Sequence, residues 1–309
     1  MKKVLVTGAN GFLGAHLSGY LSDHHYRVFA AARVKKAVLH SRAAALDITN
    51  QARVNHFIKE NRPDYICHLA GVSIPRISWE NPDETFRVNV GGTLNLLESV
   101  RRFCPSSRFL FMSSAQVYGR NFQLNRSANE KTPIWPENPY AFSKAAAELA
   151  CFEYAKKYGL HTVVVRALNI VGAGARADLA FSEWCAQIAK AEKLGSERGI
   201  SVGNLKLKRD FLHVDDAVRA MELMMRKGIR GEIYNLGSGQ TRPLNAYMKF
   251  LMKNSKVRVF PESTPTLFRA TDPQTVRINV NKLRCLGWKP QKSAFTALKE
   301  LLDEYRVSR

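Results

Sequence analysis

The sequence lacks any apolar run long enough to cross a membrane, which takes roughly 18 residues. It also lacks the pattern of a signal peptide, because the apolar run that starts at Val4 is interrupted by Thr7 and Gly8. We therefore expect a cytoplasmic protein with no membrane partner.

Cysteine is scarce, and the five that occur form no pattern. Their number is odd, they are widely spaced, and no pair has the spacing of a metal site, so a disulfide framework and a zinc module are both excluded. A reduced compartment and no bound metal are the simplest interpretation.

Acidic residues are few: 26 Asp and Glu face 47 Lys and Arg, a formal net charge of +21. The basic residues form no tail and no long run, so we expect no specific nucleic-acid partner. An even positive field attracts small anions such as a phosphorylated substrate. A non-catalytic dinucleotide-binding protein that uses this surface on RNA stays open as an alternative.

Short apolar runs alternate with longer helical patterns in the first half of the chain. The runs lack polar alternation, which is typical of buried parallel strands, and they occupy residues 4–7, 28–32, 65–70, 109–112 and 162–165. Between them, Asn81 and Pro82 begin a helix whose inner face we expect to hold Phe86, Val90, Leu94 and Leu97. The fold class is α/β, a doubly wound parallel (Rossmann) sheet.

Two domains are expected. Residues 1–166 form the dinucleotide-binding domain, rejoined by 213–238. Residues 167–309, mainly 167–212 and 239–309, form a smaller interleaved α/β domain that binds substrate. The ligand cleft is expected between the two.

A glycine loop follows the first strand. Gly8 permits a tight turn, Gly11 lets the backbone approach a pyrophosphate, and Gly14 lets the helix pack on the strand. Phe12 and Leu13 begin that helix, whose N-terminus offers unpaired N–H groups and a positive dipole end. The strand–turn–helix context favours a bound dinucleotide.

The end of the second strand distinguishes between cofactors. Arg33, with Lys35 and Lys36, stands where an acidic residue would bind the ribose of NAD, so NADP(H) is favoured and NAD(H) remains possible. Asp47, beside Ile48, either contacts the adenine amino group or caps a helix.

Three polar residues suggest an acid/base site. Ser114 ends the fourth strand, and Tyr140 and Lys144 share a helix face at i, i+4 spacing. A lysine ammonium near a phenol is expected to lower its pKa, so that Tyr140 exchanges a proton with a carbonyl or alcohol that Ser114 also contacts.

This ordered set resembles the extended short-chain dehydrogenase/reductase family of sugar-nucleotide epimerases, dehydratases and reductases. The likeness rests on residues 7–14 and 64–71 and on Asn89, Ser114, Tyr140 and Lys144. It implies a bound nicotinamide near Leu69, Ala70 and Ile48, and chemistry at a sugar C4 hydroxyl or ketone. It also implies a homodimer formed by the helices near 83–102 and 138–158.

Within the family, the C4-keto reductases of GDP-4-keto-6-deoxyhexoses are most similar. The similar segments are 78–86, 166–169 with 187–189, 202–211 and 282–290. The resemblance implies a GDP-sugar substrate of the 6-deoxymannose (rhamnose) or talose type. Its expected contacts are Arg209 and Arg269 to the diphosphate, Asn169 and Asn204 as amide contacts, Asp272 to the ribose and Ser73 to the sugar. The runs 172–176 and 269–272 depart from the family pattern.

Two positions separate the possible reactions. Gln116 stands where similar dehydratases carry a Glu, and an amide cannot be the base for dehydration. Ala115 stands where a 3,5-epimerase/reductase would carry a cysteine. Simple C4 reduction with NADPH remains, and the alternative is a C4-epimerase that keeps NAD tightly bound.

Overall fold

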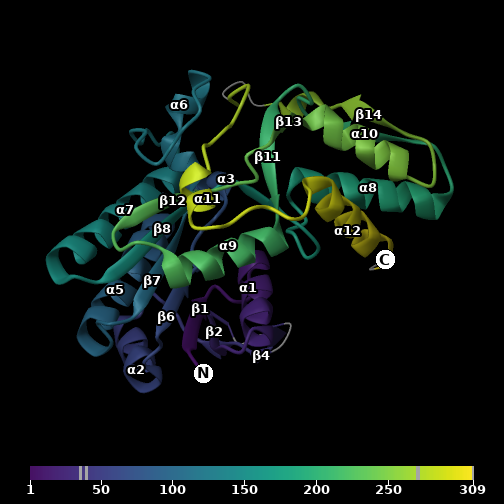
Figure 1. Cartoon of the computed structure of the whole chain (residues 1–309). Coiled ribbons are helices and arrows are strands. Elements are labelled where there is room, and N and C mark those ends of the chain that lie inside the picture. Colours follow the sequence, from purple (N-terminus) through teal and green to yellow (C-terminus); the bar gives the residue numbers. More distant parts are fainter. Residues whose placement is uncertain (35–36, 39–40, 269–271, 308–309) are drawn as a thin grey trace.

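The computed structural model describes residues 1–34, 37–38, 41–268 and 272–307. Its centre is a seven-stranded sheet in the order β12-β8-β7-β6-β1-β2-β5, with every neighbouring pair parallel (Figure 1). The strands are β1 (Lys3–Thr7), β2 (Arg27–Ala32), β5 (Ala44–Ala45), β6 (Tyr65–His68), β7 (Arg108–Ser114), β8 (His161–Ala167) and β12 (Glu232–Leu236). The doubly wound sheet and the five strands predicted for the first half are thereby confirmed, with ends shifted by a few residues.

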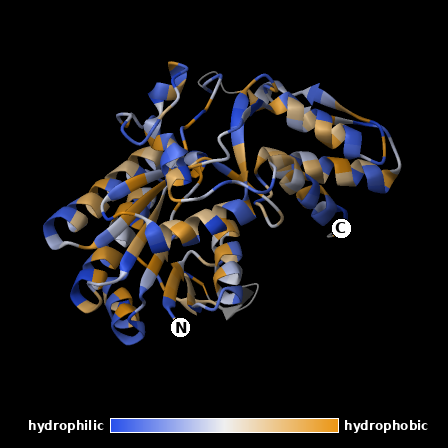
Figure 2. Cartoon of the chain, viewed as in Figure 1, coloured by the Kyte–Doolittle hydropathy of each residue, from blue (hydrophilic) through white to orange (hydrophobic). Residues whose placement is uncertain are grey.

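Helices cover both faces of this sheet. One face packs against α1 (Phe12–Asp23) and α9 (Val214–Lys227), and the other against α2 (Gln51–Asn61), α5 (Gly92–Phe103) and α7 (Pro139–Tyr158). Buried apolar side chains form a core on each face of the sheet, and hydrophobic residues recur along its strands and helices (Figure 2). Short elements complete this half: β3 (Ala37–Val38), β4 (Ser41–Arg42), α3 (Pro75–Glu80), α4 (Pro82–Phe86), the 3-10 turn Ala115–Tyr118 and α6 (Arg120–Gln123).

The remaining elements form a smaller group beside the sheet (Figure 1). It holds a three-stranded sheet, β13-β11-β9, a parallel pair, β10-β14, and an apolar core of its own. Its elements are β9 (Asn169–Val171), α8 (Ala180–Leu194), β10 (Arg198–Val202), β11 (Lys208–His213), β13 (Thr241–Pro243), α10 (Leu244–Asn254), β14 (Val259–Ser263), the 3-10 turn Pro265–Leu267 and α12 (Ala294–Val307). The short helix α11 (Asn281–Cys285) instead packs beside β12, and its Leu283 belongs to the core of the large sheet. The domain boundaries given above stay a prediction.

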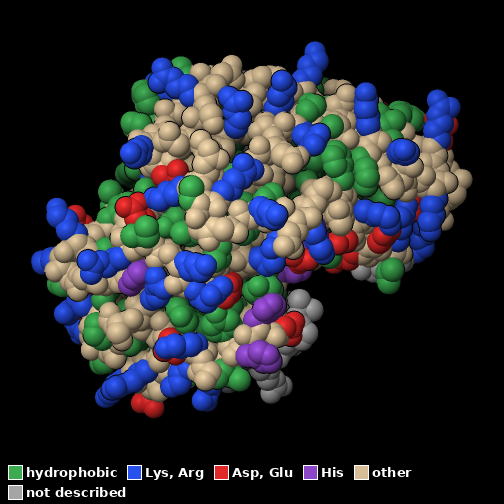
Figure 3. Space-filling view, in the orientation of Figure 1, with side chains coloured by type: hydrophobic (Ala, Val, Ile, Leu, Met, Phe, Trp, Pro, Cys, Tyr) green, Lys and Arg blue, Asp and Glu red, His purple; other side chains and the backbone are tan. Residues whose placement is uncertain are grey.

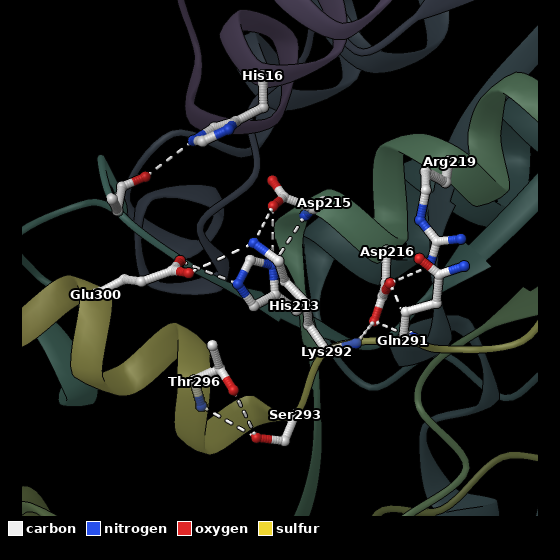
Figure 4. A network of polar contacts seen from close by, with 11 residues as sticks. His16, His213, Asp215, Asp216, Arg219, Gln291, Lys292, Ser293, Thr296 and Glu300 are labelled. Carbon is white, nitrogen blue, oxygen red and sulfur yellow. Dashed lines mark hydrogen bonds and ion pairs between the residues drawn. The ribbon is translucent and has the colours of Figure 1, made fainter.

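A polar network joins the last helix to the large sheet's helices (Figure 4). His213, at the end of β11, accepts the backbone N–H of Asp215 at 3.1 Å and lies 3.0 Å from a carboxylate oxygen of Glu300 on α12. The buried Asp216 carboxylate accepts the backbone N–H groups of Gln291 and Lys292 at 2.9 to 3.1 Å. The first turn of α9 thus anchors the segment that leads into α12.

The predicted inner face of the helix after Asn81 is right for the buried Leu97 and wrong for Leu94. A π-helical turn, Arg87–Gly91, separates α4 from α5 and rotates the surface that faces the core. Thr85, Asn89 and Thr93 are buried there, whereas Leu94 is 38% exposed. The extra residue in the turn therefore directs polar side chains inward, toward the carboxyl end of the sheet.

No helix within the described ranges is both long and apolar enough to span a bilayer. Lysine and arginine side chains are scattered over the face shown in Figure 3 rather than gathered in one patch.

Candidate active site

The glycine loop follows β1, which lies next to β6 in the sheet. The strand order reverses at this pair, because β2 lies on one side of β1 and β6 and β7 lie on the other. In a doubly wound fold, the crevice at such a reversal is the usual ligand site. Gly8 has φ +71°, and a Cβ there would lie 2.7 Å from the backbone nitrogen of Ala70. A Cβ at Gly14 would lie 2.2 Å from the carbonyl oxygen of Gly8. Only glycine fits both positions, as the motif requires.

Helix α1 begins at Phe12 directly after this loop. Its N-cap, Gly11, provides no side-chain hydrogen bond, so Phe12, Leu13 and Gly14 start the helix without a capping side chain. The loop and the helix start together fit the pyrophosphate of a dinucleotide.

The residues expected near the adenosine of the dinucleotide differ in exposure and in hydrogen bonding. Arg33 is exposed just after β2. Asp47 accepts the N–H of Thr49 at 2.9 Å and its hydroxyl at 2.7 Å, and these bonds are the main reason that its pKa lies below the ordinary value. The cap of α2 is Asn50, not Asp47. Ile48 is buried, and its carbonyl oxygen accepts the side-chain N–H of Asn95 at 2.9 Å.

Ser114, Tyr140 and Lys144 lie together at the carboxyl end of β7. Helix α7 begins at Pro139, and its buried Tyr140 lies close enough to Ser114 for that hydroxyl to affect its pKa. One turn later, Lys144 is buried and donates to the carbonyl oxygen of Met112 at 2.8 Å. The helix therefore carries two of the three side chains to the strand that carries the third.

Burial dominates the electrostatics of this cluster. It raises the pKa of Tyr140 above its ordinary value, although the nearby hydroxyl of Ser114 opposes the rise. Burial also lowers the pKa of Lys144 to about 8, against the attraction of Glu148 and Cys151. The expectation that Lys144 lowers the pKa of Tyr140 is therefore wrong for this structure, in which the ammonium is bonded to a backbone carbonyl.

A buried chain of hydrogen bonds lies behind the cluster, and the sequence analysis did not identify it. His68 lies 2.8 Å from the hydroxyl of Thr7 through Nδ1 and 3.0 Å from that of Thr93 through Nε2. The Thr93 hydroxyl donates to the carbonyl oxygen of Asn89, so Nε2 of His68 is the donor and Nδ1 the acceptor. Burial lowers the pKa of His68 to about 3, which keeps the ring neutral.

Asn89 connects this chain to the catalytic helix. Its side chain bonds both backbone groups of Val72, at 2.8 and 3.0 Å, and donates to the hydroxyl of Ser143 at 2.8 Å. Ser143 in turn donates to the carbonyl oxygen of Tyr140 at 2.7 Å. The sequence does contain a signal for this buried polar face: Thr85, Asn89 and Thr93 follow one another at intervals of four residues.

Neither residue after Ser114 is an acid or base. Ala115 is buried, and the Gln116 side chain accepts the amide N–H of Asn138 at 3.2 Å. Asn138 also caps α7, where its side-chain oxygen accepts the N–H of Ala141 at 2.8 Å. Gln116 therefore contacts the residue that caps the helix of Tyr140 and Lys144.

Asn169 and Arg209, two of the expected substrate residues, lie on the smaller group of elements. Asn169 follows β8, whose Ala167 pairs with Ser114, and its amide donates to the carbonyl oxygen of Asp210 at 3.2 Å. Arg209 is half-buried on β11 and donates to the carbonyl oxygens of Lys208 and Pro273, both at 2.9 Å. Burial lowers its pKa, and the charge of Asp272 opposes this, so Arg209 and Asp272 are near one another.

The surroundings of two other expected substrate residues, Asn204 and Ser73, do not indicate a ligand site. The Asn204 side chain accepts the N–H of Lys206 at 3.0 Å within a loop. Ser73 is exposed in the loop after β6. Arg269 lies outside the described residues, as do Lys35 and Lys36.

Comparison with known proteins agrees with this geometry. The model of the NAD dependent epimerase/dehydratase family matches residues 4–237. The chain is 30% identical over 305 residues to GDP-6-deoxy-D-mannose reductase of Pseudomonas aeruginosa, covering 98% of this chain and 97% of that one.

Two solved structures share the whole fold. RMD of Pseudomonas aeruginosa, complexed with NADPH, aligns over 100% of both chains with a TM-score of 0.86 and 28% identity. UDP-glucose 4-epimerase of Thermotoga maritima, with UDP-glucose, aligns over 99% of both chains with a TM-score of 0.89 and 26% identity. Sequence and fold together show that the chain is an enzyme of the NAD dependent epimerase/dehydratase family, the extended short-chain dehydrogenases/reductases.

Proposed function

We propose that this enzyme reduces the C4 ketone of a GDP-4-keto-6-deoxyhexose with NADPH. One observation carries the proposal: Ser114, Tyr140 and Lys144 meet at the end of β7, and the two positions that follow hold Ala115 and Gln116. Reduction of a ketone needs one proton donor. Dehydration and double epimerisation need a further acid or base, which neither alanine nor an amide supplies.

The chain's residues have distinct roles in this reaction. When bound, a reduced nicotinamide supplies the hydride. Tyr140 donates its phenolic proton to the oxygen of C4 as that carbon is reduced, and Ser114 donates a hydrogen bond to the same oxygen. Because burial keeps the pKa of Tyr140 above its ordinary value, the tyrosine is protonated at neutral pH, as a proton donor must be. Lys144 holds the nicotinamide ribose.

The glycine loop and the end of β2 support the cofactor assignment. Gly8 and Gly14 allow the tight turn and the close packing of α1 that a Cβ would prevent, and this geometry fits a loop in which Gly11 faces a bound pyrophosphate. Arg33, exposed after β2, can pair with a 2′-phosphate and so favours NADPH over NADH. The Pseudomonas aeruginosa neighbour was solved with NADPH.

The substrate assignment rests on the smaller group of elements. Arg209 has a half-buried guanidinium that bonds to carbonyl oxygens, which suits it to bind a diphosphate. Asp272, Asn169, Asn204, Ser73 and Arg269 are the further contacts that we assign to the nucleotide sugar. The guanine base follows the relative that is a GDP-6-deoxy-D-mannose reductase.

The test measures coenzyme consumption with GDP-4-keto-6-deoxymannose. We expect one NADPH oxidised per sugar reduced, faster than with NADH, and little turnover with the corresponding UDP or dTDP sugars. Turnover with a UDP or dTDP sugar but not with the GDP sugar would move the proposal to another nucleotide. Activity with NADH alone would contradict the role of Arg33.

A C4-epimerase is the second candidate, favoured by the similarity to UDP-glucose 4-epimerase. The same three side chains serve both reactions. An epimerase returns the hydride to the sugar, so it consumes no coenzyme and is purified with NAD bound. Denaturation of the purified protein and chromatography of the released nucleotide distinguish the two.

We also propose that the enzyme is a homodimer. Three large apolar side chains are exposed on the neighbouring helices α5 and α7: Leu94 on α5 is 38% exposed, and Phe142 and Leu149 on α7 are 56% and 58% exposed. A second copy would bury this apolar face. Leu149→Glu is expected to halve the mass measured by light scattering, whereas Leu194→Glu, an equally exposed leucine on α8, is expected to leave it unchanged.

A further inference from the structure

Glu148 lies one helical turn beyond Lys144, and the site described above gives it no role. Its carboxylate is 1% exposed and forms a fork with Arg166, with Nε 3.0 Å from Oε1 and Nη2 2.6 Å from Oε2. Oε1 also accepts the hydroxyl of Ser113. One carboxylate thus joins β8 to α7 and β7, the two elements that carry Tyr140, Lys144 and Ser114.

The charges in this layer do not cancel. Lys144 and Arg166 are cations, and Glu148 is the anion between them, while His68 on β6 is neutral. The other titratable groups around Lys144 are Cys151 and Tyr140, both on α7 and both uncharged at neutral pH because burial raises the pKa of each. The ring of Phe111 lies 4.9 Å from the ammonium. Lys144 therefore depends on Glu148 for a compensating negative charge.

Arg166 fixes the position of that charge. It is 4% exposed at its side chain, lies over the ring of Tyr118 at 4.8 Å, and bonds the carboxylate through two nitrogens. The fork therefore fixes the carboxylate of Glu148 one turn from Lys144 on α7.

We propose that Glu148 is the positioning residue of this site: clamped by Arg166 and Ser113 one turn beyond Lys144, it supplies the buried negative charge that keeps Lys144 an ammonium bonded to the carbonyl oxygen of Met112. The inference rests on the proposed function, because it assigns Glu148 to the reaction for which Lys144 is used. Glu148 and Arg166 therefore have opposite effects on the protonation of Lys144. Removing the carboxylate makes Lys144 easier to deprotonate, and removing the guanidinium makes it harder.

The experiment measures the pKa of Lys144 directly, by NMR of protein labelled with [ε-13C]lysine, with the resonance assigned by its loss in Lys144→Arg. In Glu148→Gln we expect the pKa of Lys144 to fall by about one unit, and in Arg166→Met we expect it to rise. Glu192→Gln is the matched control, because Glu192 is 6% exposed and forms a comparable ion pair with Arg306 on the smaller group of elements. It should cost stability and leave Lys144 unchanged.

The kinetic expectation follows from the same charge. In Glu148→Gln the alkaline fall of kcat moves to lower pH by about one unit, so kcat drops about tenfold above pH 8, with little change in KM for the nucleotide sugar. A role confined to folding would lower the amount of active enzyme at every pH and leave the profile in place.

Each outcome decides the proposal. Equal pKa values of Lys144 in wild type and Glu148→Gln, or shifts of the same sign in Glu148→Gln and Arg166→Met, would overturn it. If either single variant fails to fold, the double variant Glu148→Gln/Arg166→Met, which leaves no unpaired charge in the Glu148–Arg166 pair, is measured instead. Its Lys144 must still titrate below wild type. The NMR result needs no turnover, so a wild type that does not reduce the sugar refutes the proposed function without deciding the role of Glu148.

Discussion

The glycine loop and the substrate side of the cleft are constrained by different physics. At the loop, backbone atoms approach so closely that only glycine fits: a Cβ at Gly8 or Gly14 would lie within 3 Å of another backbone atom. On the substrate side, Arg209 and Asn169 bond to backbone carbonyls that many residues could provide. Steric exclusion requires one residue type at a fixed position, so it can be recognised in the sequence. A charged side chain can reach the same ligand atom from several positions in the chain, so its position is not fixed by a motif. This difference explains why the first region is assigned by motif and the second only by likeness to relatives.

The largest expected effect lies at the junction of the two regions. Tyr140→Phe removes the proton donor and should lower kcat about a thousandfold, with coenzyme affinity nearly unchanged. Tyr247→Phe, which alters a buried tyrosine in the core of the smaller group, is the control and should keep kcat. Stopped-flow or steady-state NADPH oxidation measures both. Equal rates in the two variants would remove Tyr140 from the mechanism.

The glycine loop allows a direct test of close backbone approach. Gly8 and Gly195 both have positive φ, +71° and +62°, but a Cβ at Gly195 meets nothing within 4 Å. Gly195→Ala should cost about 1 kcal/mol from backbone strain alone. Gly8→Ala should cost about 2 to 4 kcal/mol, because the clash with Ala70 adds to the strain.

Urea unfolding measures these costs, and quenching of tryptophan fluorescence measures NADPH binding. Gly8→Ala should also weaken NADPH about tenfold or more, because the loop must move away from the pyrophosphate. If the two alanine variants lost equal stability, steric crowding would not be the reason for this glycine.

On the substrate side the expected effect is on binding. Arg209→Met should raise KM for the nucleotide sugar about 10- to 100-fold, the usual cost of losing a hydrogen bond to a charged group, and change kcat little. Arg258→Met is the matched control, since that arginine is 80% exposed in its side chain and pairs with Glu197 on the surface. A fall in kcat at unchanged KM would place Arg209 at the chemistry instead.

The smallest expected effect concerns the neutral histidine behind the loop. Burial lowers the pKa of His68 from about 6.5 to about 3, so between these values the unfolded chain binds a proton that the folded chain does not. Stability contributed by this histidine is present above pH 6.5 and is lost as the pH falls toward 3. From pH 6.5 to 5 the loss should be about 1.5 kcal/mol.

Urea unfolding of wild type and His68→Gln at the two pH values isolates this contribution. The variant is less stable at both, but its stability should fall less on acidification. Parallel losses in the two proteins would mean that His68 does not titrate differently on folding.

Much of the fold was readable from the sequence, because parallel strands buried on both faces are plain apolar runs and the glycine loop has one geometry. The inner face of the helix after Asn81 was readable only in part. Phe86, Val90, Leu94 and Leu97 recur at helical spacing, but the π-helical turn at Arg87–Gly91 turns Asn89 and Thr93 inward instead. Backbone hydrogen bonds set this rotation, and hydrophobic periodicity does not report them.

The electrostatics of the site also lay beyond the sequence. The spacing of Tyr140 and Lys144 predicts a shared helix face, but the sign of the pKa shift at Tyr140 depends on burial and on where the ammonium points. Glu148 lies at regular spacing after Lys144, yet its clamp by Arg166 joins residues that are far apart in the chain. Such contacts become visible only when the strands are placed side by side.

The most direct test of the central claim uses NADPH that carries deuterium at both positions of the nicotinamide C4, with GDP-4-keto-6-deoxymannose. A reductase yields a GDP-6-deoxyhexose with deuterium at C4 of the sugar, and one NADP⁺ for each sugar formed. NMR of this product then assigns the configuration at C4. A sugar product without deuterium, formed with no loss of NADPH by protein that carries its own NAD, would contradict the account and identify an epimerase.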